Sequence, residues 1–156
     1  MTWLQTDESQ LMRDRVSTIE RRDDAVFISL TRTATLSITT AGVIVTWQND
    51  IDSGGNMTYS GSSITVPMAG YYLLSVLGTL GTKDDIFGDV VVNGVEVATM
   101  GTAGSKDTKF RHSIMRFYKA GDVVQYRATT KTGTMTLQVN TEDAANESPI
   151  LHMVLL

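Results

Sequence analysis

The feature that most constrains the fold is the segment Ile64–Val76, in which a proline and a glycine precede two consecutive tyrosines. Pro67 lacks a backbone N–H and has a fixed φ, so it ends the strand before it. Gly70 suits a tight corner, because glycine adopts backbone conformations closed to other residues. Tyr71 and Tyr72 then point to opposite faces of the next strand, since side chains alternate along a strand. One tyrosine can pack inside the protein's own sandwich and the other against a neighbouring subunit.

From residue 25 onward the sequence predicts short strands separated by turns. Strands and turns recur at a spacing of roughly 8–12 residues, which is typical of a sandwich of antiparallel sheets. Two polar stretches, Asn49–Asn56 and Gly101–Thr108, predict loops. The predicted strands cover residues 25–30, 36–38, 43–47, 57–59, 62–66, 71–80, 86–92, 95–100, 110–118, 123–130, 135–139 and 150–156.

Two further turn motifs follow the tyrosines. Val92–Val95 places Asn-Gly between β-branched residues, the strongest short hairpin signal. Tyr118–Val124 places Gly-Asp between two apolar strands. Three motifs therefore follow one another along the chain: Pro-x-x-Gly-Tyr-Tyr, then Asn-Gly, then Gly-Asp-x-Val. In this order they resemble the globular head of the complement and tumour-necrosis-factor superfamily. The resemblance covers residues from Ala25 to Leu156. The last strand, Ile150–Leu156, lacks the Phe and Gly usual in that family. The resemblance implies an all-β jelly-roll β-sandwich of about ten strands, homotrimeric through one sheet.

The trimer interface is expected on one face of the strand after Gly70. By alternation, Tyr71, Leu73 and Ser75 share a face, and we expect this face to meet the trimer axis. An aromatic side chain buries about 150 Å² or more in such a position. The resemblance implies that the last strand runs close to the trimer centre, so His152 could meet its copies there. Three histidines could bind a metal ion or hydrogen-bond, and we favour a buried imidazole with satisfied hydrogen bonds.

The first 24 residues differ in composition from the rest. They contain no glycine and carry four arginines. We expect residues 1–24 to form a helical or extended attachment arm and residues 25–156 to form the jelly-roll head. A frayed terminal helix that binds nothing is the alternative, although tryptophan is a favoured interface anchor. The residues expected to attach the arm to a partner are Trp3, Leu4, Leu11, Met12, Val16 and Ile19.

No catalytic constellation is visible in the sequence. It has no cysteine and only two histidines. His112 is expected on the polar face of a strand rather than as a catalytic base. No Ser-His-Asp order or nucleophile elbow is present. We therefore expect no enzyme activity and no cofactor.

The acidic residues do not form a clear metal site. Asp50–Gly54 resembles the opening of a calcium loop, but the twelfth position is Gly61 rather than the required Glu. We expect a polar surface turn there. Asp84, Asp85 and Asp89 form a second acidic group. The sequence leaves open whether calcium binds near either group, and we expect no metal.

Composition narrows the function classes. The 156-residue chain is long enough to bury a core without disulfides, and its net charge of −4 argues against nucleic-acid or membrane partners. No apolar stretch of the kind found in a signal peptide follows Met1. We therefore expect the protein to be assembled in a host cytoplasm. We expect a tailed-phage capsid decoration, or cement, protein on the virion surface, whose partner is the major capsid protein. A receptor- or glycan-binding knob of a tail fibre or tail needle, with the two loops as its binding surface, is the alternative.

Overall fold

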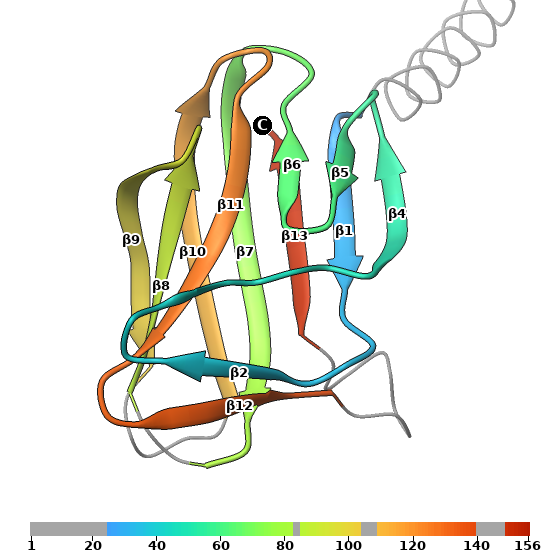
Figure 1. Cartoon of the computed structure of the whole chain (residues 1–156). Coiled ribbons are helices and arrows are strands. Elements are labelled where there is room, and N and C mark those ends of the chain that lie inside the picture. Colours follow the sequence, from blue (N-terminus) through green and yellow to red (C-terminus); the bar gives the residue numbers. More distant parts are fainter. Residues whose placement is uncertain (1–24, 83–84, 104–108, 140–148) are drawn as a thin grey trace, which may run out of the picture.

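The computed structural model of the chain describes residues 25–82, 85–103, 109–139 and 149–156. These residues form two antiparallel sheets, one of seven strands and one of six (Figure 1). No helix among them could cross a membrane. The strands are β1 (Phe27–Thr31), β2 (Leu36–Thr39), β3 (Val43–Ile44), β4 (Asn49–Gly54), β5 (Thr58–Ser60), β6 (Ser63–Thr65), β7 (Gly70–Leu80), β8 (Ile86–Val92), β9 (Val95–Ala103), β10 (Lys109–Tyr118), β11 (Val123–Thr130), β12 (Thr134–Gln138) and β13 (Ile150–Leu155).

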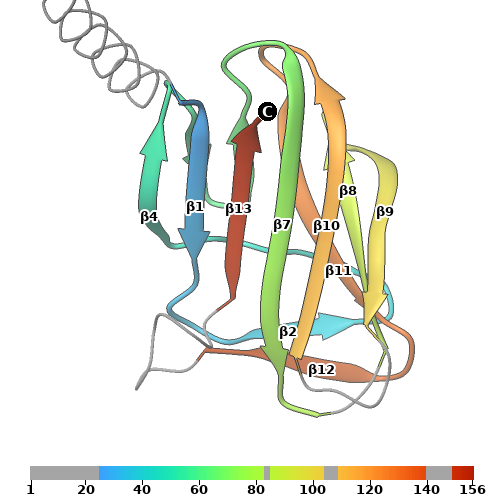
Figure 2. The ribbon, with the colours of Figure 1, turned by 180° about the vertical axis from the view of Figure 1, so that it is seen from behind.

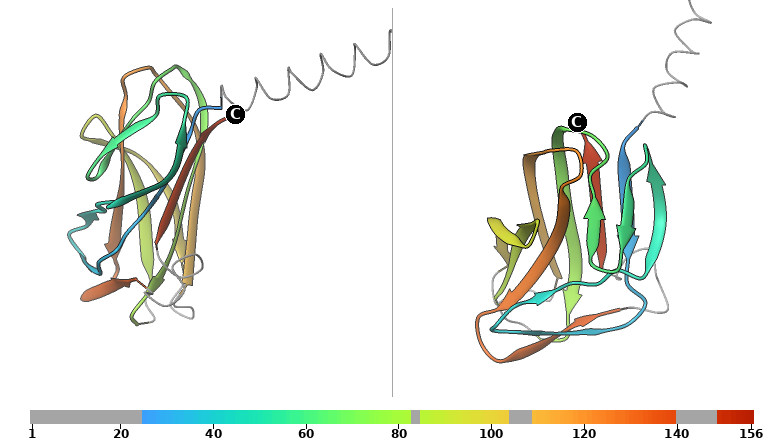
Figure 3. Two further views of the ribbon diagram at one scale, coloured as in Figure 1. Left: turned by 90° about the vertical axis from the view of Figure 1, so that its right-hand side faces the viewer. Right: turned by 45° about the horizontal axis from the view of Figure 1, so that its top comes forward.

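The first sheet joins the two ends of the described chain. Its strands follow the order β2-β12-β7-β13-β1-β4, and β10 pairs with β7 (Figure 2). Strand β1 pairs antiparallel with β13, and the N–H of Leu155 donates to the carbonyl of Val26 at 2.9 Å. Ala25 and Leu156 therefore lie at the same end of the sandwich, as Figure 3 shows for the start of β1 and the C-terminus.

The second sheet has the order β5-β6-β11-β8-β9, with β3 paired to β11. The core lies between the two layers, and the longer strands β7, β10 and β11 contribute largely alternate side chains to it. On β7, Tyr72, Leu74 and Val76 are fully buried, whereas Tyr71 is exposed. The predicted placement of the two tyrosines on opposite faces is confirmed. The Tyr72 hydroxyl donates to the carbonyl of Met68 at 2.9 Å, so the buried ring keeps a hydrogen-bond partner.

The two predicted turn motifs lie side by side. Asn93 and Gly94 have φ of 53° and 82°, which is the geometry of a two-residue hairpin turn between β8 and β9. The Asn93 side-chain amide donates to Asp122 Oδ1 at 2.9 Å, and its oxygen accepts the N–H of Val123 at 2.9 Å. The N–H of Lys119 donates to Asp122 Oδ2 at 2.8 Å. The two hydrogen bonds to Asp122 hold the pKa of its carboxyl group below the usual value. The bond from Lys119 has the larger effect, and the bond from Asn93 adds to it.

The predicted reason for Gly70 is wrong. Gly70 begins strand β7, and its φ is not positive, so the corner does not need a special backbone conformation. A Cβ at this position would approach Leu155 Cδ1 to 2.4 Å. A side chain at this position would therefore have to displace the end of the Leu155 side chain.

Three strand predictions also need correction. The seven-stranded and six-stranded sheets together hold more strands than the roughly ten that the resemblance implies, and one more than the twelve strand ranges predicted from the sequence. Strand β3 ends at Ile44 rather than at Trp47, because the N–H of Trp47 donates to the carbonyl of Gly61 and not to β11. Asn49–Asn56 is not a loop, since most of it forms β4. Strand β4 has a polar sequence because it is the last strand of its sheet and its residues are almost all exposed.

The predicted attachment arm, residues 1–24, lies outside the described residues. The six residues proposed to attach it to a partner therefore lie outside them too. So do Asp84 and most of the predicted loop at 101–108.

Candidate functional site

Exposed apolar side chains gather at one end of the outer face of the first sheet. Strands β7 and β10 lie side by side there, and the residue after β13 joins them (Figure 2). We call the following residues the apolar patch: Tyr71, Leu73, Met115, Phe117 and Leu156. Contiguous apolar surface of this kind marks an interaction site more often than scattered single residues do.

Cross-strand pairing builds the apolar patch. Tyr71 lies opposite Phe117 and Leu73 lies opposite Met115 in the β7–β10 register. The rings of Tyr71 and Phe117 meet edge to face, with centroids 5.4 Å apart. Tyr71 is nevertheless 57% exposed and Phe117 49% exposed. The N–H of Leu156 donates to the carbonyl of Tyr71 at 2.9 Å, which holds the backbone of Leu156 beside the start of β7. The pair is thus ordered but unburied.

A row of polar residues crosses the same face beside the apolar patch. His152 on β13 lies opposite Ser29 on β1 and Ser75 on β7. Ser75 lies opposite Ser113, and Ser29 lies opposite Asp52 on β4. We call these five residues the polar row. The Ser29 hydroxyl and His152 Nδ1 are hydrogen-bonded at 2.7 Å.

The four residues predicted to share a trimer interface share this outer face. Tyr71 and Leu73 belong to the apolar patch, and Ser75 and His152 to the polar row. The sequence analysis missed Met115 and Phe117. Alternation along β10 was the available signal, but apolar residues occur on both faces of that strand, so the outward set could not be chosen.

His152 is exposed in the single chain, and its burial near the trimer centre stays a prediction. Burial of part of the ring and the charge of Arg111 lower its pKa. Its contact with Ser29 pairs a hydroxyl with a base, which the sequence analysis did not foresee. The pair lies on a sheet face, and among the described residues the ring has no second side-chain partner that would orient it. A catalytic triad needs that third group.

His112 lies in the core, so its predicted position on a polar face is wrong. It is 1% exposed, and its Nδ1 is hydrogen-bonded to the Tyr126 hydroxyl at 2.8 Å. Gly88 lies opposite Gly101 on the neighbouring strand, and a Cβ at Gly88 would come within 2.2 Å of the imidazole. Burial lowers the pKa of His112 to about 4, although the carboxylate of Asp89 opposes the shift.

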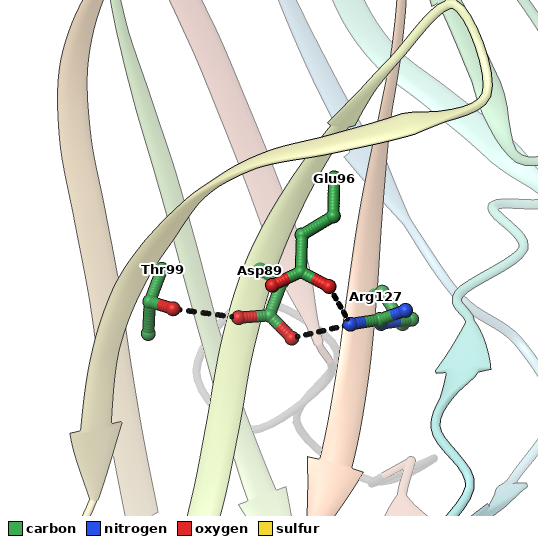
Figure 4. Close-up of polar contacts among 4 residues, drawn as sticks. All are labelled: Asp89, Glu96, Thr99 and Arg127. Carbon is green, nitrogen blue, oxygen red and sulfur yellow. Dashed lines mark hydrogen bonds and ion pairs between the residues drawn. The ribbon is translucent and has the colours of Figure 1, made fainter.

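An ion-pair cluster ties three strands of the second sheet together (Figure 4). Arg127 Nη2 on β11 lies 3.1 Å from Asp89 Oδ2 on β8 and also pairs with Glu96 on β9. The Thr99 hydroxyl donates to Asp89 Oδ1 at 3.0 Å. The hydrogen bond to Asp89 is the main cause that raises the pKa of Arg127. One arginine therefore pairs with two carboxylates, and the cluster cross-links β8, β9 and β11.

Among the described residues, no three His, Cys, Asp or Glu side chains gather as a metal site. Asp50 and Asp52 are exposed along β4.

Neither a protein-family model nor a curated protein matches this sequence. Solved structures match its fold. The crystal structure of murine APRIL at pH 8.5 has a TM-score of 0.61 at 17% identity, covering 85% of this chain and 99% of that chain. Those of murine APRIL at pH 5.0 and pH 8.0 both give a TM-score of 0.57, at 16% and 15% identity, with the same coverage. The fold is a tumour-necrosis-factor-like jelly roll, and the predicted fold class is confirmed.

Proposed function

We propose that this chain is a homotrimeric structural head that decorates a bacteriophage capsid, with its copies packed through the outer face of the first sheet. The apolar patch carries this proposal. A half-exposed aromatic ring leaves roughly 100 Å² to be buried, which is worth about 2 kcal/mol per ring at about 25 cal/mol per Å². The superfamily resemblance of the turn motifs supports three copies rather than two.

The position of residue 25 supports attachment through the N-terminal segment. The start of β1 and the C-terminus lie at the same end of the sandwich (Figure 3). Leu156 belongs to the apolar patch, so the patch lies at this end too. If the copies pack through this face around an axis that runs along the strands, residue 25 of every copy lies at the same end of the assembly. Three segments 1–24 then leave together, and linked binding gains strongly from effective concentration. We propose that these segments bind the major capsid protein.

Attachment can be tested on the full chain. Shells without the protein are mixed with wild type, with Trp3→Ala/Leu4→Ala and with the neighbouring control Gln5→Ala/Thr6→Ala, and bound protein is measured by co-sedimentation. We expect the first variant to lose binding and the control to keep it. Equal coating by all three would contradict the arm. Circular dichroism checks that each variant is folded.

A receptor- or glycan-binding knob of a tail fibre or tail needle is the second candidate. Strand β4 supports it, because Ile51 is 55% exposed between Asp50 and Asp52. The register shift between β1 and β4 and the two carboxylates discourage pairing with a further strand, so a ligand would meet side chains. This candidate predicts that Ile51→Ser abolishes binding to host cells while Trp3→Ala does not.

We also propose that the head has no catalytic role. The Ser29–His152 pair is the closest approach to a nucleophile and base on the described face, and it lacks an orienting third group. Hydrolysis of an ester or peptide substrate that disappears in Ser29→Ala would overturn this proposal.

A further inference from the structure

We infer that self-association through the outer face of the first sheet is acid-labile and that His152 is the group that senses pH. This inference rests on the proposed function, because it describes regulation of the same surface. Three features of the surface support it: the position of His152 in the face, its neighbours on each strand and the charges around it.

His152 lies on β13, which is hydrogen-bonded to β1 on one side and β7 on the other. Its own strand places Ile150 and Val154 next to it on the same face, because side chains alternate. Val154 lies opposite Leu73, and Ile150 lies opposite Leu77. The imidazole is therefore a polar group between two apolar rows. A partner that covers the apolar patch also covers this ring.

The nearest polar neighbours cannot neutralise an imidazolium. Ser29 and Ser75, which lie opposite His152 on the adjacent strands, carry uncharged hydroxyls. A serine hydroxyl can donate to the neutral ring or accept from the charged ring, so it favours neither form strongly.

The charged groups near His152 on this face lie on the outer strands. Asp52, on β4, belongs to the polar row. Arg111, on β10, lies opposite Leu77 in the next row, with Lys109 one row further along. Each outer strand is two strand spacings from β13, about 10 Å away. At that separation the charges on the free face are largely screened by salt. On the described strands of this sheet, Arg111 and Lys109 oppose a proton on His152, and Asp52 favours one.

Assembly makes protonation of His152 more costly. Covering the face removes water from the ring, and symmetry brings copies of the same charge into one interface. The assembled state then binds fewer protons than the separated chains, so a falling pH favours separation. The loss of association occurs at pH values below 6.5, the ordinary pKa of histidine. Each further unit by which assembly lowers the His152 pKa weakens association about tenfold per chain.

The test is sedimentation velocity of the full chain at micromolar concentration, at about pH 7.5 and about pH 5, which lie on either side of the ordinary histidine pKa. The variant is His152→Gln, which can still accept a hydrogen bond from Ser29 but does not titrate. We expect wild type to be assembled at the higher pH and to dissociate at least tenfold more readily at the lower one. We expect His152→Gln to stay assembled at both. The buried His112, with a pKa of about 4, does not titrate in this range.

The outcomes separate the two proposals. A monomeric wild type at about pH 7.5 contradicts the proposed function and this inference with it. Wild type that stays assembled at about pH 5, or His152→Gln that dissociates as wild type does, overturns the inference alone.

A second measurement covers a variant that fails to assemble at any pH. The chain has two histidines, so NMR resolves the titration of each ring. The His152 pKa in assembled wild type must lie below that in a monomeric Tyr71→Glu chain, and equal values overturn the inference.

Discussion

Mild acid should destabilise the folded head through His112, at pH values where ordinary carboxylates are still charged. The imidazole is buried and neutral, with a folded pKa of about 4, whereas its pKa in the unfolded chain is the ordinary 6.5. Between these values the unfolded chain binds a proton that the folded chain does not. Stability is therefore fully present above pH 6.5 and falls as the pH approaches 4.

The size of the effect follows from the difference of the two pKa values. Each unit of difference corresponds to about 1.4 kcal/mol, so the complete loss is about 3 kcal/mol. About 2 kcal/mol of this is already lost at pH 5, because the unfolded imidazole is then almost fully protonated. A loss of this size is a large fraction of the free energy of unfolding of a typical domain.

The assay is urea unfolding between pH 7 and pH 5, followed by circular dichroism. It is carried out in a monomeric Tyr71→Glu background, so that self-association does not contribute. His112→Gln in the same background is the comparison, since glutamine can accept from Tyr126 but does not titrate. His152 is present in both chains, so the difference between their pH slopes isolates His112.

If the free energy of unfolding of the Tyr71→Glu chain does not change between pH 7 and pH 5, this explanation is wrong. So would an equal slope in the His112→Gln chain. NMR titration of the folded protein gives an independent check, because the His112 signal should not titrate above pH 5.

Two further changes test the packing of the head by urea unfolding. Gly88→Ala should lower the free energy of unfolding by about 1–3 kcal/mol or more, because its Cβ would meet the buried ring of His112 at 2.2 Å. Gly81→Ala is the control, since its Cβ would meet only the flexible end of a side chain. Equal losses of stability in the two variants would contradict the steric reason. Asn93→Ala should lower the free energy of unfolding by about 1–2 kcal/mol. It removes both side-chain hydrogen bonds between the two turns and places alanine at a positive φ that asparagine tolerates better. Unchanged stability would contradict the role assigned to Asn93.

Local signals in the sequence were enough to locate most strands. The bounds of β8 and β11 agree with the prediction, because turn residues flank apolar runs of strand length there. Strand β4 was missed, since an edge strand exposed on both faces has no alternation to detect. The turn motifs predicted the jelly roll, but not that Asn93 and Asp122 bond to each other.

The environments of the two histidines depend on contacts between distant residues. His112 is buried because Gly88 and Gly101 come into register across from it. His152 meets Ser29 because the first and last described strands pair, although the two residues are 123 positions apart. Neither arrangement has a local signature. The sequence could therefore place both residues on strands but could not assign either its surroundings.

The measurement that tests the central claim most directly is the molar mass of the protein in solution, by sedimentation equilibrium at micromolar concentration. The account predicts three times the 17.0 kDa chain mass for wild type. Tyr71→Glu and Phe117→Glu should give monomers, because each places a charge in the apolar patch. Val95→Glu is the matched control, since Val95 is 63% exposed on β9, away from the apolar patch, and it should remain trimeric. A monomeric wild type, or patch variants that assemble as Val95→Glu does, would contradict the account.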